Sequence, residues 1–149
     1  MTPARPTVSV VVPVLDDAEH LRVCLALLAA QSRPALEVVV VDNGCVDDSA
    51  VLARAAGARV VHEPRRGVPA AAAAGLDAAV GELLVRCDAD TRMPADWLER
   101  IVARFDADPG LDALTGPGTF HDQPGLRGRV RAALYTCLLY TSDAADDTP

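Results

Sequence analysis

The sequence contains no lysine: all 14 of its basic residues are arginines, in a chain of 149 residues. A Walker A phosphate loop, a Schiff-base enzyme and a pyridoxal-phosphate enzyme all need a lysine amine. A phosphoacceptor receiver domain also pairs its clustered aspartates with a lysine. The missing lysine therefore excludes a Walker A loop, a Schiff-base enzyme and a pyridoxal-phosphate enzyme, and it argues against a receiver domain.

Cysteine pairs, long apolar runs and a signal peptide are missing too. The four cysteines, Cys24, Cys45, Cys87 and Cys137, are widely spaced and form no CxxC pair, which argues against a zinc knuckle or a disulfide scaffold. No run reaches the roughly 18 apolar residues of a membrane span, and the polar first residues do not resemble a secretion signal. We therefore expect reduced thiols and a cytoplasmic protein.

Charge and composition narrow the remaining classes. The net charge of −7 and the pI of about 4.8 disfavour a nucleic-acid binder or a basic membrane-surface protein, so we expect no nucleic-acid partner. Hydrophobic residues make up 50% of the chain, and a chain of this length forms about one domain with its own core.

Apolar runs typical of buried strands alternate with helical patterns along the chain. Strands are predicted over residues 8–14, 36–41, 59–62 and 82–87, with a further short strand over 111–115. Helices are predicted between the first four strands and after the fourth, where Trp97, Ile101 and Phe105 share a face. This alternation predicts right-handed βαβ units, and hence an α/β fold with a mostly parallel sheet flanked by helices.

Acidic residues directly follow three of the four main predicted strands. Asp16 and Asp17 follow the first strand, Asp42 the second, and Asp88 and Asp90 the fourth. In open parallel sheets, ligands bind outside the carboxyl ends of the strands. The topology therefore predicts that these carboxylates gather at one edge of the sheet.

The tripeptide Asp88-Ala89-Asp90 is the sharpest local motif. Two carboxylates separated by one residue can approach the same hard cation, and Mg²⁺ or Mn²⁺ is often held by one or two carboxylates together with substrate phosphates. The alternative is structural, with the two aspartates capping the next helix and bracing the turn. The tripeptide alone does not decide between them.

The tripeptide Asp42-Asn43-Gly44 lies at an abrupt strand end. The functional interpretation is that the Asp42 carboxylate accepts hydrogen bonds from a nucleobase or a ribose. The alternative, which the tripeptide alone favours, is an Asx turn in which Gly44 takes a positive φ. Asp47 or Asp48 is expected to cap the helix that follows.

Four sequence blocks together resemble the family-2 glycosyltransferases, which have the Rossmann-like GT-A fold. The blocks are VSVVVPVLDDAEHL from residue 8, VVVVDNGCVDDS from 38, RRGVPAAAAAGLDAAVGE from 65 and LLVRCDADTRMPADWLERI from 83. No single block is specific, but four in this order and spacing are. The resemblance covers about residues 7–120.

The resemblance assigns roles residue by residue. It implies that Asp42 reads the nucleobase, usually uracil, that the turn after the first strand packs around the nucleoside, and that a divalent cation, Mn²⁺ or Mg²⁺, bridges the diphosphate. The nucleotide-sugar-binding residues that it implies are Pro13, Val14, Leu15, Asp17, Asp42 and Asp88, and the metal ligands are Asp90 and Asp88.

Three positions depart from the family pattern. Leu15 stands where an aromatic residue is frequent, so stacking on the base is expected to be weaker. Ala72 and Ala73 stand where many members have Arg-Asn, so a usual polar contact to the donor is missing. Asp16 replaces a common asparagine.

The implied function is transfer of a sugar from a nucleoside-diphosphate sugar, usually UDP-linked, to an acceptor hydroxyl of a glycan, a lipid or a small molecule. The reaction is expected to be metal-assisted and inverting. One alternative is a non-catalytic nucleotide-binding module of the same fold. A second is a haloacid-dehalogenase-type phosphohydrolase using Asp88, but its DxDxT spacing fails because Thr91 directly follows Asp90.

The end of the chain resembles no protein family. From Cys137 onward, CLLYTSDAADD resembles the translation of a transposase adapter used in sequencing libraries. We therefore expect residues 1–136 to be the nucleotide-sugar-binding part of a truncated GT-A domain and residues 137–149 to be non-native. The general base is expected beyond the truncation, as are any segments that attach the protein to the inner face of a membrane.

Overall fold

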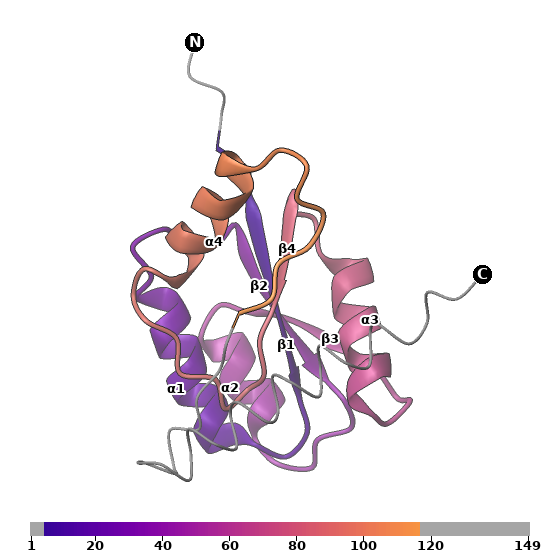
Figure 1. Ribbon diagram of the computed structural model, residues 1–149. Coiled ribbons are helices and arrows are strands. Elements are labelled where there is room, and N and C mark those ends of the chain that lie inside the picture. The colour runs from indigo at the N-terminus through magenta and orange to yellow at the C-terminus, as the bar shows by residue number, and fades with distance from the viewer. Residues whose placement is uncertain (1–4, 117–149) are drawn as a thin grey trace, which may run out of the picture. The chain divides into compact units, whose positions relative to one another are not determined.

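The structure, a computed structural model, describes residues 5–116, which Figure 1 draws as a coloured ribbon. Residues up to 109 belong to one compact unit, and residues 110–116 belong to a second. The first unit contains a parallel sheet with the strand order β3-β2-β1-β4. Its elements are β1 (Val8–Val14), α1 (Ala18–Ala29), β2 (Glu37–Asp42), α2 (Ser49–Ala55), β3 (Arg59–His62), α3 (Val68–Ala78), β4 (Leu83–Arg86) and α4 (Trp97–Ala107). The predicted α/β fold is confirmed.

Helices cover both faces of the sheet, as expected for strands that are apolar on both sides (Figure 1). One core lies between the sheet and helices α1, α2 and α4, and includes the even-numbered valines of β1. A smaller core lies under α3 and contains Val11, Val39, Val41 and Ala71. The central strand β1 is therefore buried on both faces and holds the two cores together.

Helix α3 approaches the sheet closely at Gly75. A Cβ atom at this position would lie 2.3 Å from Cγ1 of Val11 and 2.7 Å from Cγ2 of Val41. Because both valines are fully buried in strands, neither can move aside without disturbing the core. Glycine is therefore required here by the packing distance between helix and sheet.

One detail of the sequence prediction is wrong. Residues 111–115, predicted as a strand, do not form one. An apolar run this short is stable as a strand only when a neighbouring strand pairs with it. On α4, Leu98 and Val102 are buried. The predicted face of Trp97, Ile101 and Phe105 is half-buried, and Trp97 and Ile101 pack against the larger core.

A polar network closes the edge of the sheet at the amino ends of its strands. The Glu37 carboxylate accepts hydrogen bonds from the hydroxyl of Ser9 at 2.8 Å and from the amide of Val80 at 2.9 Å, and it pairs with Arg59 at 2.8 Å. Burial acts to raise the pKa of Glu37, but these hydrogen bonds and the arginine outweigh burial and lower it.

Stability is expected to fall on acidification as Glu37 is protonated. A carboxylate with a lowered folded pKa contributes stability above its unfolded pKa, near 4.5, and loses that contribution as the pH falls through the folded value. In Glu37→Gln, urea unfolding between about pH 6 and about pH 3.5 should depend less on pH than in the wild type. Glu19→Gln, on the exposed first turn of α1, is the control and should keep the wild-type slope. An unchanged slope in Glu37→Gln would contradict this assignment.

Candidate functional site

The acidic strand ends lie along one edge of the sheet, as predicted. Strand β1 lies between β2, which ends at Asp42, and β4, which is followed by Asp88. Val14 is in register with Asp42, and Val11 is in register with Arg86. Since adjacent strands lie about 4.8 Å apart, the ends of β2 and β4 are separated by about 10 Å across β1.

Asp42 forms the Asx turn that its tripeptide predicts. Its Oδ1 atom accepts hydrogen bonds from the amides of Gly44 at 3.1 Å and Cys45 at 2.8 Å, and Gly44 has a φ of 87°. The other oxygen, Oδ2, lies 3.5 Å from Nδ1 of His62. Burial acts to raise the pKa of Asp42, but the amide hydrogen bonds outweigh burial and lower it. Asp42 is thus held as a carboxylate. Its Oδ1 atom accepts two hydrogen bonds, whereas Oδ2 makes the longer contact with His62.

Asn43 is a structural residue that the sequence prediction missed. Its side chain is 3% exposed and donates hydrogen bonds to the carbonyls of Glu63 and Arg65, both at 2.8 Å. Its Oδ1 atom accepts a hydrogen bond from the amide of Gly67, also at 2.8 Å. One buried amide therefore fixes the loop between β3 and α3 against the end of β2. The only signal in the sequence is an asparagine placed between a buried strand and a glycine.

The turn between β1 and α1 places its predicted residues in different environments. Pro13 is half-buried and Leu15 is 42% exposed, so both present apolar surface at the site edge. The Val14 side chain is 3% exposed and belongs to the core. Asp17 pairs with Nδ1 of His20 at 2.6 Å. Direct ligand contact through side chains is therefore open to Pro13 and Leu15, whereas the Val14 side chain faces inward.

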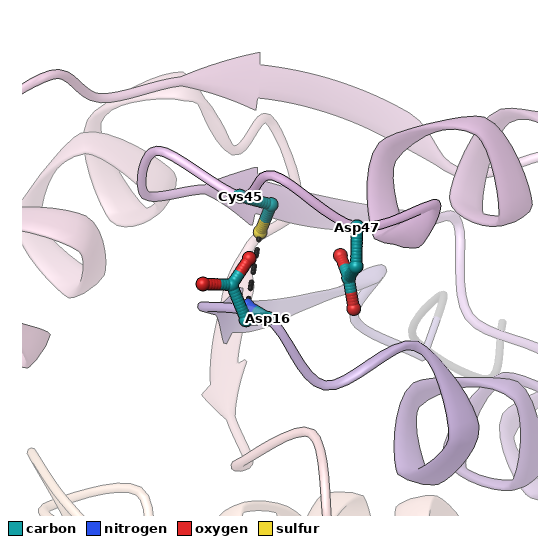
Figure 2. A group of neighbouring side chains, drawn as sticks. All are labelled: Asp16, Cys45 and Asp47. Atoms are coloured by element: carbon teal, nitrogen blue, oxygen red, sulfur yellow. Dashed lines mark hydrogen bonds between the residues drawn. The ribbon is translucent and has the colours of Figure 1, made fainter.

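Figure 2 shows Asp16, Cys45 and Asp47, each of which has one potential ligand atom within 4.8 Å of those of the other two. These groups already have partners in the chain. The two oxygens of Asp47 accept hydrogen bonds from the first amides of α1 and α2, Ala18 at 2.9 Å and Ser49 at 3.0 Å. Asp16 has a positive φ of 51° and accepts a hydrogen bond from the Val46 amide at 2.6 Å. The cluster therefore joins the loops after β1 and β2.

The cap predicted for α2 is confirmed at Asp47, which also caps α1. Asp17 and Asp48 occupy the N-cap positions of α1 and α2 but make no capping hydrogen bond through their side chains. Sequence proximity points to Asp47 as a cap for α2 alone. Its second role depends on the side-by-side placement of β1 and β2, which local sequence does not encode.

The Asp88-Ala89-Asp90 turn points its two acids away from the core. Cys87 and Ala89 are buried, whereas Asp88 and Asp90 are exposed, so the alternation of β4 continues past its end. The Asp88 amide donates to Oγ1 of Thr91 at 3.1 Å, and the Thr91 amide donates to the Asp88 carbonyl at 3.0 Å. This reciprocal pair closes the turn and holds both carboxylates on one exposed surface.

The donor set of this turn fits a hard divalent cation. Within residues 5–116, the Asp90 carboxylate makes no hydrogen bond or ion pair, and Asp88 is paired through one oxygen, Oδ1, with Arg86 at 2.7 Å. Free, exposed carboxylate oxygens are the ligands that Mg²⁺ and Mn²⁺ prefer. The turn is therefore better suited to a cation than the Asp16, Cys45 and Asp47 cluster, whose oxygens accept helix amides.

The described cysteines are free thiols, as predicted from their spacing. Cys24 and Cys87 are buried and share a hydrogen bond, which together with burial raises the pKa of Cys87. Burial also raises the pKa of Cys45. Cys137 and the adapter-like tail lie outside the described residues. The Cys45 and Cys87 thiols are thus poor nucleophiles or metal ligands, and Cys24 and Cys87 act as small core residues.

The four-stranded parallel sheet with flanking helices matches the GT-A fold of solved glycosyltransferase structures that resemble this chain. The chain belongs to glycosyl transferase family 2, whose model matches residues 9–142. It is therefore a glycosyltransferase-family chain, and the predicted family and fold are confirmed.

Curated relatives share this assignment. The chain is 41% identical over 113 residues to an uncharacterized glycosyltransferase, Rv0539, of Mycobacterium tuberculosis, covering 76% of this chain and 49% of the relative. It is 36% identical over 117 residues to an undecaprenyl-phosphate 4-deoxy-4-formamido-L-arabinose transferase of Pseudomonas paraeruginosa, covering 72% and 34%. The chain thus spans about half, or less, of the length of these relatives.

Among solved structures, the chain resembles glucosyl-3-phosphoglycerate synthase from Mycobacterium tuberculosis. In its complex with Mn²⁺, UDP-glucose and phosphoglyceric acid, the TM-score is 0.51 at 29% identity, covering 56% of this chain and 33% of the synthase. In its complex with UDP, the TM-score is 0.53 at 30% identity, covering 60% and 35%. Of the helices that the structure describes here, none is both long and apolar enough to cross a membrane.

Proposed function

We propose that this chain binds the donor of a metal-assisted, inverting glycosyltransferase that moves a UDP-linked sugar to an acceptor hydroxyl. The observation that carries the proposal is the placement of Asp42 and the Asp88–Asp90 turn on opposite sides of the β1 end. The ends of β2 and β4 lie about 10 Å apart across β1, and we assign the donor to the edge between them. The UDP complexes of the related synthase support the choice of nucleotide.

The nucleoside end of the donor is assigned to the edge formed by β1 and β2. The Asp42 carboxylate is an acceptor for the imide N–H of uracil, and its lowered pKa keeps it ionised at neutral pH. Pro13 and Leu15 supply apolar contact to the base and the ribose. Val14, through its buried side chain, and Asp17, through its pair with His20, hold the turn in place.

The diphosphate end is assigned to the turn after β4. Asp90 is the principal metal ligand, and Asp88 contributes its free oxygen to the metal or to the ribose. A bound Mn²⁺ or Mg²⁺ supplies Lewis-acid stabilisation of the charge on the nucleoside-diphosphate leaving group. Asp88 and Asp90 hold that ion against the exposed surface of the turn, and Thr91 keeps the turn closed.

The acceptor side of the reaction is assigned to sequence beyond this donor-binding part. The relatives point to different acceptors, since one is named an undecaprenyl-phosphate 4-deoxy-4-formamido-L-arabinose transferase and the solved synthase is bound to phosphoglyceric acid. We assign donor binding to residues 1–136 and the general base to sequence beyond them, so the chain alone should bind donor without completing transfer. The chain covers 49% of the Mycobacterium tuberculosis relative, which supports placing the acceptor side in further sequence.

Calorimetric titration with UDP tests the proposal. The wild-type chain should bind UDP about tenfold more tightly with Mn²⁺ than without it, because the ion joins the diphosphate to Asp90. Asp90→Ala should lose that gain. UDP should bind more tightly than ADP, because adenine has no imide N–H to donate to Asp42.

The matched control is Asp106→Ala, which removes an exposed aspartate from α4 and should leave UDP binding unchanged with and without Mn²⁺. An Asp90→Ala variant that keeps the full Mn²⁺-dependent gain would refute the metal assignment. A wild-type chain that binds no UDP under either condition would refute the proposed donor.

A further inference from the structure

The segment around the metal-type turn is electrically balanced. Between residues 86 and 92, two arginines accompany the two aspartates in the sequence RCDADTR. The Arg86 guanidinium forms an ion pair with Asp88, and Arg92 donates a hydrogen bond to the Asp90 carbonyl at 3.3 Å. A bare cation approaching this turn therefore meets a segment with no net charge.

The ion pair between Arg86 and Asp88 is held by the fold. Arg86 is the last residue of β4 and is in register with Val11 of the central strand. The next amide, that of Cys87, donates to the Val11 carbonyl at 3.1 Å, and Thr91 fixes the Asp88 backbone. Both partners are thus anchored through their main chains, and the guanidinium lies 2.7 Å from Oδ1 of Asp88.

A guanidinium in this position opposes cation binding in two ways. It occupies one of the four carboxylate oxygens of the turn, and its positive charge repels a divalent ion that approaches the other three. A nucleoside diphosphate reverses the balance, because its phosphates add negative charge and further oxygen ligands for the same ion. Ion and nucleotide are then each bound more tightly in the presence of the other.

We propose that Arg86 is a positioning residue that makes divalent-cation binding at the Asp88–Asp90 turn depend on a nucleoside diphosphate. The inference rests on the proposed function, because it takes the turn as the metal site for the donor. Its consequence is that the chain takes up the cation together with the nucleotide and leaves free cations largely unbound.

The test measures Mn²⁺ affinity of the full chain by electron paramagnetic resonance, with and without saturating UDP. Without UDP, Arg86→Gln should bind Mn²⁺ about fivefold more tightly than the wild type, because a nearby positive charge is removed. In Arg86→Gln, the factor by which UDP tightens Mn²⁺ binding should be about fivefold smaller than in the wild type. Arg86→Lys keeps the charge and should behave more like the wild type than Arg86→Gln does.

The sign of the change separates this role from a structural one. If Arg86 merely supported the turn, Arg86→Gln would weaken Mn²⁺ binding or leave it unchanged, and either result overturns the inference. Arg54→Gln, in the exposed last turn of α2, removes the same charge elsewhere and should change neither affinity. Because the Arg86 pair is solvent-exposed, the variants are expected to stay folded, which circular dichroism checks.

The outcome also distinguishes the two proposals from each other. A wild-type chain whose Mn²⁺ affinity does not respond to UDP would contradict the proposed function and this inference together. A wild-type chain that shows the response, alongside an Arg86→Gln variant with the same response, would overturn the role of Arg86 alone.

Discussion

Gly75→Ala is expected to destabilise the protein by about 3 kcal/mol, as an overpacked core does when no neighbour can move. The added methyl would lie 2.3 Å from Val11 and 2.7 Å from Val41, far inside normal contact distance. Alanine favours helix by about 1 kcal/mol over glycine, so the steric cost must first offset that gain. Urea unfolding at neutral pH measures the difference, and Gly75→Val should be largely unfolded without denaturant.

Gly116→Ala is the control, because none of the described residues has an atom within 4 Å of a Cβ at that position. It should change the free energy of unfolding by less than about 0.5 kcal/mol. If Gly75→Ala were as stable as Gly116→Ala, α3 would have to lie further from the sheet than the structure places it.

Asn43→Ala is expected to cost about 3 kcal/mol, because it removes three hydrogen bonds at a buried position. The amide of Gly67 and the carbonyls of Glu63 and Arg65 would lose their partner. Asn43→Asp should cost more, because a carboxylate would face two carbonyl oxygens where an amide N–H₂ now donates. The shift of the urea midpoint measures both variants.

Asp48→Ala, an exposed substitution whose side chain makes no capping hydrogen bond, serves as control and should stay within about 0.5 kcal/mol of the wild type. In Asn43→Ala, UDP affinity should fall as well, since the loop beside Asp42 is no longer fixed. An Asn43→Asp variant as stable as the wild type would contradict the two hydrogen bonds that the Asn43 amide donates to the carbonyls of Glu63 and Arg65.

The sheet and its acidic edge were predictable because they follow from periodic or local signals. The valine run of β1 predicts a strand buried on both faces, and the register of β1 and β2 then brings Val14 level with Asp42. The Asx turn at Asp42 and the positive φ of Gly44 follow from the tripeptide itself. These elements need no knowledge of distant contacts.

Contacts between distant loops could not be predicted in this way. Gln31 donates to the Pro94 carbonyl at 2.8 Å and accepts from the Leu98 amide at 3.1 Å, so it joins the end of α1 to the start of α4. Neither contact leaves a periodic pattern in the sequence. The same holds for Asn43, whose partners lie 20 to 24 residues away. The roles of Gln31 and Asn43 depend on contacts that form only in the folded chain, so the neighbouring sequence does not reveal them.

The position of β4 has a consequence for how the protein opens. Among the described strands, β4 lies at one edge of the sheet and pairs with β1 through four residues, Leu83 to Arg86. Edge elements with short ladders tend to detach before the centre of a sheet does. Detachment of β4 would carry away Asp88 and Asp90 while leaving Asp42 in place. A ligand that binds Asp42, Asp88 and Asp90 together is therefore expected to slow hydrogen exchange at the β4 amides. Donor binding and local unfolding of β4 are then linked, because the ligand binds only when the strand is paired.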